Sequence, residues 1–145
     1  MMTIEPYQAG LINKNIFTQK RKVMGEFVAL TDITFESRGL KLIAPFSRVI
    51  STNEIHELMI TDERDAGPDK VINRVSVMGF FEVKIGGVVV VGDVVIIKRT
   101  SIGEIAGFDM THAPNHLGIV VKTNTLNLFT PRLGEKIIII PKSLA

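Results

Sequence analysis

The stretch VGDVVII at residues 91–97 decides the fold class, and LGEKIII at residues 133–139 repeats its pattern. Each has an apolar residue, a glycine and an acid near the start of an apolar run. Glycine adopts turn geometry that other residues resist, and the acid can cap nearby amides. The runs 94–97 and 137–140 contain no polar alternation, which indicates strands buried on both faces. Two such corners favour a closed β-barrel that the chain enters twice.

Strand patterns also occur elsewhere in the chain. Residues 23–33 are rich in valine, phenylalanine and threonine and partly alternate, and residues 40–43 form a second apolar run after Gly39. The β-like runs 83–85 and 88–91 flank Gly86-Gly87, which predicts a hairpin. We therefore predict a mainly β protein, a small closed or partly open β-barrel with one or two short helices.

One segment carries a helix signal. Ser51-Thr52-Asn53-Glu54 fits the capping box, in which a hydroxyl and a glutamate satisfy the first amides of a helix. Ile55, Leu58 and Met59 follow at helical spacing. The same stretch through Ile60 can pair as a strand, so the sequence leaves both structures open.

Composition indicates one domain over residues 1–145, with residues 1–20 as an extended N-terminal arm. The 145 residues are 46% hydrophobic and 22% charged, which excludes the compositions of disordered and fibrous chains. With no cysteine, disulfides and thiolate chemistry are excluded. Residues 1–10 lack a signal-peptide core, and no apolar stretch is long enough to span a bilayer. These features predict a cytoplasmic protein that does not enter the membrane.

Charge and strand pattern also bear on the partners of the protein. The net charge of +2 gives no argument for nucleic acid, although a barrel with exposed aromatics could stack single strands. The phenylalanines to suspect are Phe80, Phe81 and Phe129. If residues 137–140 formed an edge strand, their isoleucines would leave one face apolar, which predicts a homo-oligomer. The alternative is burial of these isoleucines in the core.

The polar loop before residue 117 is the most informative part of the chain for function. It brings carboxylate, hydroxyl, amide and imidazole groups together between two apolar segments, as ligand-binding loops do. Its candidate site residues are Asp109, Thr111, His112, Asn115 and His116.

One interpretation of this loop is a metal site. His112 and His116 with the carboxylate of Asp109 would supply two imidazoles and one carboxylate, a set suited to zinc or iron. Pro114 lies between the histidines, so the loop would have to fold back to bring them together. Candidates for a further ligand, chosen by side-chain type alone, are Glu104, His56 and Glu57.

A second interpretation needs no metal. Asp109 would orient one imidazole of the pair His112 and His116, which would then move protons as a catalytic group. Thr111 and Asn115 would hold the substrate. The cations Lys98 and Arg99, at the end of the preceding strand, would add positive charge for a carboxylate or phosphate.

A third interpretation is structural, because aspartate, threonine and asparagine are good turn residues and histidines can bond backbone groups. The sequence thus predicts a small-molecule binding protein or enzyme that uses Asp109, His112 and His116 at the mouth of a barrel. The alternative is a non-catalytic β-barrel module for assembly or nucleic-acid contact. Convergence of the three side chains beside a pocket would distinguish the two.

Overall fold

The computed structural model describes residues 6–9 and 20–145, so nearly all of the predicted N-terminal arm lies outside the described residues. The described chain is almost entirely β. Its strands are β1 (Val23–Phe35), β2 (Leu40–Lys41), β3 (Ser47–Ile50), β4 (Ile55–Thr61), β5 (Val71–Ile72), β6 (Val75–Ile85), β7 (Gly87–Val90), β8 (Val94–Ile97), β9 (Thr100–Asp109), β10 (Gly118–Lys122) and β11 (Lys136–Ile140). A short 3-10 helix, η2 (Lys142–Leu144), follows β11.

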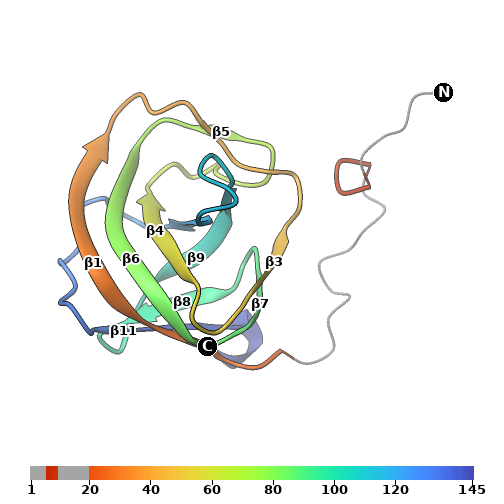
Figure 1. Ribbon diagram of the computed structural model, residues 1–145. Helices are drawn as coiled ribbons and strands as arrows, with labels where there is room; N and C mark the ends of the chain where they lie inside the picture. Colours follow the sequence, from red (N-terminus) through yellow and green to blue (C-terminus); the bar gives the residue numbers. More distant parts are fainter. Residues whose placement is uncertain (1–5, 10–19) are drawn as a thin grey trace.

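Seven strands close into a barrel in the order β1-β11-β8-β9-β10-β4-β6, which confirms the predicted fold class (Figure 1). β1 closes it, because its first residues pair with β11 on one side while its full length pairs with β6 on the other. β10 runs parallel to β4, and the other barrel pairs are antiparallel. Within the described ranges, no helix has the length and apolar character needed to cross a bilayer.

Two apolar clusters lie on opposite sides of the barrel wall. The inner cluster fills the barrel, and its bulkiest members are Phe27, Phe81 and Phe108. The outer cluster includes Leu42 and Ile72, which belong to the β2 and β5 region that covers the wall from outside. Burial on both faces explains why several strands of this barrel lack polar alternation.

The isoleucine run lies in β11, between β1 and β8, and not at a sheet edge. Ile137, Ile139 and Ile140 are buried, whereas Ile138 is half-buried and faces outward. The core of the chain itself therefore buries most of this run. The run no longer argues for a second subunit.

The two glycine corners have the geometry that the sequence predicts. Gly92 has φ 97° and Gly134 has φ 81°, both in the region that favours glycine. The backbone amide of Val90 donates to Oδ2 of Asp93 at 2.9 Å, so the acid caps its corner. Lys20 forms an ion pair with the same carboxylate at 2.5 Å, which holds the residues just before β1 beside this corner.

The predicted hairpin around Gly86-Gly87 is wrong. β7 pairs with β3 and not with β6, because β6 continues its own pairing with β1 and β4 up to this point. A Cβ at Gly86 would lie 2.6 Å from the carbonyl oxygen of Ile50. The glycine thus lets the chain pass tightly against the end of β3 and leave the barrel wall.

The segment that carried the helix signal forms strand β4. The backbone amide of Ser51 donates to Oε1 of Glu54 at 2.8 Å, and the amide of Glu54 donates to the carbonyl of Ser51 at 3.1 Å. These bonds resemble half of a capping box, but they close a turn that leads into a strand. Pairing of β4 with β6 and β10 outweighs the local preference.

Close approach of neighbouring strands makes one glycine critical. A Cβ at Gly103 would collide with the carbonyl oxygen of Lys122 in the adjacent strand, whereas Gly67 has only one atom within 4 Å, at 3.9 Å. We expect Gly103→Ala to lower the free energy of unfolding by about 2–3 kcal/mol, as overpacking does. Gly67→Ala should change it by less than about 0.5 kcal/mol. Urea unfolding measures both, and equal effects would contradict this account of the wall.

Candidate functional site

The predicted polar segment, residues 104–116, divides in the structure: its first part ends β9, and residues 110–117 join β9 to the start of β10 at one end of the barrel. Successive turns fold it back on itself: the amide of Ala113 donates to the carbonyl of Met110 at 3.1 Å, and that of Asn115 to the carbonyl of His112 at 2.9 Å. The imidazoles of His112 and His116 consequently stack, with ring centroids 5.0 Å apart and planes inclined by 28°. The sequence thus identified two histidines that do come together.

The other predicted residues of this loop stabilise its turns. Oδ1 of the buried Asp109 accepts from the backbone amide of Thr111 at 3.0 Å and also from the Thr111 hydroxyl. Nδ2 of Asn115 lies 3.1 Å from Nδ1 of His116. Within the described residues, Asp109 forms no hydrogen bond to either imidazole, and its Oδ1 stabilises the adjoining turn.

The carboxylate beside the histidines comes from Glu57 in β4. Its Oε1 lies 3.6 Å from Nε2 of His116, and only 13% of the Glu57 side chain and 14% of the His116 side chain are exposed. The ring of Phe80 packs edge-on against His116, with centroids 5.1 Å apart. Nε2 of His116 is buried and has no hydrogen-bond partner within the described part of the chain. A buried polar atom without a hydrogen-bond partner is a place where a ligand or a proton acceptor can bind.

Strand register explains how Glu57 reaches the loop. Gly118 pairs with Asp109 on one side and with Glu57 on the other, so a residue without a side chain separates the two acids. Glu57 also pairs with Phe80 in β6. In the sequence, Glu57 is a candidate only by its side-chain type. Phe80 cannot be recognised there as part of this cluster, because Phe80 and Phe81 look alike in an apolar strand.

Burial raises the pKa of Glu57 above the ordinary glutamate value, and the nearby Asp109 carboxylate raises it further. His116 and His112 act in the opposite direction, and burial prevails. A carboxyl group with a raised pKa beside an imidazole is the pairing that acid–base chemistry uses.

The predicted metal set does not assemble. Nowhere in residues 6–9 and 20–145 do three or more histidine, aspartate or glutamate side chains form a group that could hold a metal ion. Oδ1 of Asp109 is bonded within its own turn, while His112 stacks flat on His116 and does not converge with it on one point. Zinc or iron held by Asp109, His112 and His116 is therefore not supported.

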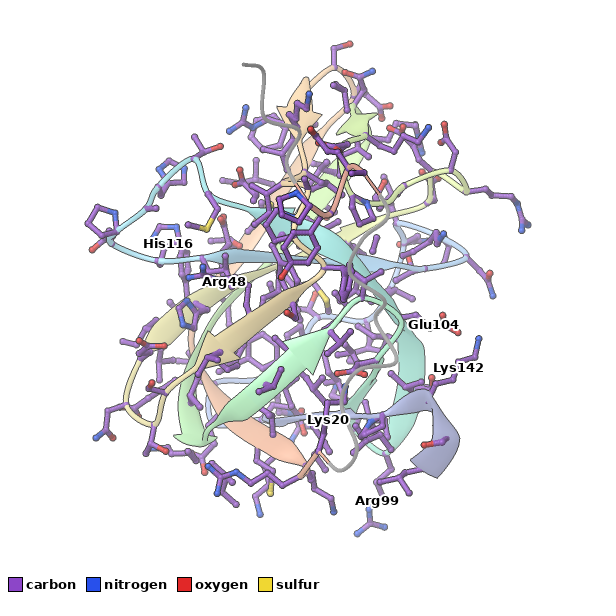
Figure 2. The ribbon with its side chains drawn as sticks, turned by 90° about the vertical axis from the view of Figure 1, so that its right-hand side faces the viewer. Lys20, Arg48, Arg99, Glu104, His116 and Lys142 are labelled. Atoms are coloured by element: carbon purple, nitrogen blue, oxygen red, sulfur yellow. The ribbon has the colours of Figure 1, made fainter. Side chains whose placement is uncertain are left out.

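The two other residues named as further ligands lie elsewhere. Nδ1 of His56 accepts from the amide of Leu117 at 3.0 Å, and its Nε2 lies 3.0 Å from Glu54, so His56 anchors the end of the loop. Glu104 forms an ion pair with Lys142 at 2.9 Å, well away from His116 (Figure 2).

The predicted cations Lys98 and Arg99 lie at the opposite end of the barrel from the histidine loop. They form the turn between β8 and β9, whereas the loop follows the far end of the ten-residue strand β9. At about 3.3 Å per residue that strand separates them by roughly 30 Å. Figure 2 shows Arg99 and His116 far apart. Proximity in sequence was misleading here, because a full strand intervenes.

The end of the barrel that holds Lys98 and Arg99 also has a hollow of about 430 Å³ that the sequence did not predict. Its floor contains the core residues Ile60 and Met78, and Phe129 of the loop between β10 and β11 forms part of its wall. Polar residues on its lining are Thr31, Asp32, Thr34, Glu36, Arg74, Ser76, Asn127 and Thr130. These residues come from β1, the start of β6 and the loop, so no single stretch of sequence reveals the hollow.

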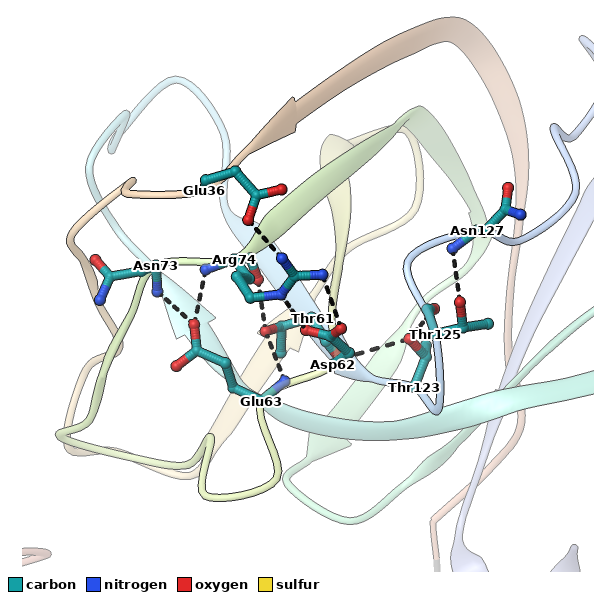
Figure 3. Close-up of polar contacts among 9 residues, drawn as sticks. All are labelled: Glu36, Thr61, Asp62, Glu63, Asn73, Arg74, Thr123, Thr125 and Asn127. Atoms are coloured by element: carbon teal, nitrogen blue, oxygen red, sulfur yellow. Dashed lines mark hydrogen bonds and ion pairs between the residues drawn. The ribbon is translucent and has the colours of Figure 1, made fainter.

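A network of polar contacts shapes the rim of this hollow (Figure 3). Nε and Nη2 of Arg74 donate to the two carboxylate oxygens of Asp62 at 3.0 and 3.1 Å, and Nη1 donates to Glu36. This hydrogen bonding holds the pKa of Asp62 below its usual value. The hydroxyl of Thr61 donates to the carbonyl of Arg74 at 2.7 Å, which ties the end of β4 to the start of β6.

Several polar side chains on the lining have no bonded partner within the described residues. Among the residues that the structure describes, none bonds to the carboxylate of Asp32 or to the side-chain amide of Asn127. The backbone amide of Asn127 donates to the Thr125 hydroxyl at 3.0 Å, which fixes the position of the residue while leaving its side chain free. The hollow thus offers exposed polar groups beside an apolar floor, as small-molecule sites do.

Comparison with known proteins gives a family but no activity. A family model described as a family of unknown function, DUF6917, matches residues 17–133, which include most of the barrel, the histidine loop and the hollow. No curated protein matches the chain. No solved structure matches it either.

The raised pKa of Glu57 predicts how stability changes with pH. The folded protein keeps a proton on Glu57 above the ordinary value of 4.5, at which the unfolded chain loses it. Stability from this group is therefore full below that value and is lost as pH rises through the folded pKa. We expect Glu57→Gln to gain stability relative to the unmodified chain between acid and neutral pH. Urea unfolding across this range measures the gain, and the exposed Asp65→Asn exchange, as control, should show none.

Proposed function

From its geometry we propose that this chain, which belongs to the DUF6917 family of unknown function, is a small-molecule binding protein. Its ligand enters the barrel mouth at the hollow beside Asp32 and Asn127. The observation that carries this proposal is the hollow itself, with the exposed side chains of Asp32 and Asn127, unpaired within the described residues, on its lining. Its volume of about 430 Å³ lies within the range of small-ligand pockets, roughly 300–1,000 Å³. Mouths of β-barrels are common places for such sites.

The lining indicates the kind of ligand. Asp32 and Glu36 contribute two carboxylates and Arg74 one cation, and the cation is held by Asp62 and Glu36. The hydroxyls add further acceptors and donors. A molecule that donates several hydrogen bonds, such as a polyol, a sugar or an amine, suits this lining best.

Rigid support favours binding without large rearrangement. Glu63 accepts from the backbone amides of Asn73 and Arg74 at 2.7 Å each, and the amide of Thr123 donates to the carbonyl of Thr61 at 2.8 Å. These bonds join the strand ends on both sides of the hollow. Because the surrounding backbone is fixed, less entropy is lost when a ligand is held there.

A second candidate function is acid–base catalysis at Glu57 and His116. A specific observation favours it: the buried Nε2 of His116 has no hydrogen-bond partner within the described residues and lies 3.6 Å from the carboxyl group of Glu57. In this form of the metal-free interpretation, His116 and His112 remain the imidazoles. Glu57 replaces Asp109 as the carboxyl group beside them. A bound substrate would complete the bond that His116 lacks.

Ligand mapping by NMR tests the first proposal and separates it from the second. Isotope-labelled protein is titrated with millimolar polyols, monosaccharides and primary amines. We expect chemical-shift changes to gather at the end of β1, the start of β6 and residues 126–131. An Asp32→Asn, Asn127→Ala double variant should lose at least about tenfold in affinity for the compound that binds, in line with the loss of two hydrogen bonds.

Asp65→Asn in the loop before β5 removes one exposed carboxylate away from the hollow and serves as the matched control. It should keep the affinity of the unmodified chain. Shifts that gather on Glu57, Phe80 and residues 110–117 would favour the second candidate. A panel that produces no localised shifts would contradict binding of this class at the mouth.

A further inference from the structure

We infer that the chain carries a second binding site, for an organic phosphate of nucleotide size, in the basic groove formed by Lys98, Arg99, Arg132 and Lys136. The groove encloses about 760 Å³ on the outer surface of the barrel. Ile96 and Ile138 line the same groove and form its apolar floor. This site is separate from the hollow inside the mouth and from the histidine cluster.

Strand pairing brings the four cations together from two distant parts of the sequence. β8 pairs with β11 so that Ile97 lies opposite Ile137. The turn after Ile97 therefore lies beside the residues that precede Ile137. Ile96 and Ile138 also pair directly, and both are half-buried on the outer face. Two basic turns thus flank a small apolar surface.

Most of the positive charge in this groove is not neutralised. Within the described residues, Arg99, Arg132 and Lys136 have no acidic partner. The acid on the lining, Glu135, lies 4.0 Å from Lys98. Such a concentration of unpaired cations attracts an anion with more than one negative charge.

The turn that presents Lys98 and Arg99 has an unusual sequence for its geometry. Lys98 has φ 55° and Arg99 has φ 60°, the pair of positive angles that defines a tight hairpin turn favouring Asn-Gly. Two long cationic side chains occupy positions where smaller residues would be more stable. Backbone strain of this kind gathers at functional sites.

Side-chain chemistry points to phosphate. The ammonium of Lys98 lies 4.8 Å from the centroid of the Phe129 ring, a cation–π contact that orients the Lys98 side chain. Guanidinium groups such as those of Arg99 and Arg132 bind phosphate through paired hydrogen bonds and also stack on flat rings. An apolar or aromatic body would lie on Ile96 and Ile138. A nucleoside diphosphate combines these features.

Calorimetric titration with adenosine diphosphate tests the site on the full chain. We expect saturable binding that weakens with salt, and weaker binding of both inorganic phosphate and adenosine, because each lacks half of the recognised features. Lys98→Asn, Arg99→Gly should weaken binding of adenosine diphosphate at least about tenfold, as loss of charged hydrogen bonds does. The same variant should melt a few degrees higher, because Asn-Gly suits the turn.

A second variant separates charge from turn geometry. Arg132→Ala, Lys136→Ala should lose affinity to a similar extent without the gain in melting temperature. Lys41→Ala, Lys70→Ala removes two exposed charges from the outer β2 and β5 region and should bind adenosine diphosphate as the unmodified chain does.

Three outcomes would overturn the proposal. The first is no binding of adenosine diphosphate at millimolar concentration. The second is equal loss of affinity in the Lys41, Lys70 control, which would indicate unspecific attraction. The third is binding of oligothymidylate that strengthens with strand length, which would identify the groove as a surface for single-stranded nucleic acid.

Discussion

Closure of the barrel by β1 is the constraint on which the rest of the structure depends. One strand of thirteen residues pairs with β6 along its length and with β11 at its start, so the first and last barrel strands meet. Register shifts in the pairing with β6 let β1 bend around the core. Closure leaves the barrel with two distinct ends. The histidine loop lies at one end, and the hollow and the basic groove lie at the other.

Glycines at close strand contacts make this closure possible. A Cβ at Gly79 would collide with the carbonyl of Ala29, and a Cβ at Gly25 would lie 2.6 Å from the ring of Phe81. The missing side chain of a glycine also allows functional groups on neighbouring strands to approach each other. Gly118 leaves room between Asp109 and Glu57, so that the Glu57 carboxyl can approach His116 over the outer face of the wall. Packing of the wall and the chemistry of the histidine cluster therefore rest on the same residue type.

The barrel could be predicted from the sequence because its evidence is local. Apolar runs without alternation and glycine corners such as Gly92 reflect burial and backbone angle, which neighbouring residues reveal. Pairing partners are not local, which is why the Gly86-Gly87 hairpin prediction failed. The approach of His112 to His116 was predictable from their shared loop. Glu57 was a candidate only by its side-chain type and Asn127 had no predicted role, because only the closed barrel brings them to their sites.

Phe129 links the two sites at the mouth end of the barrel. Phe129 lines the hollow, and its ring also contacts the ammonium of Lys98, which lines the basic groove. A substitution at Lys98 therefore removes a contact of Phe129, which lines the hollow. Arg132 and Lys136, in contrast, line the groove and not the hollow. If a ligand in the groove held Lys98 away from the ring, the wall of the hollow would lose a stabilising cation–π contact. The two sites would then influence each other through this single aromatic side chain, without any movement of the strands.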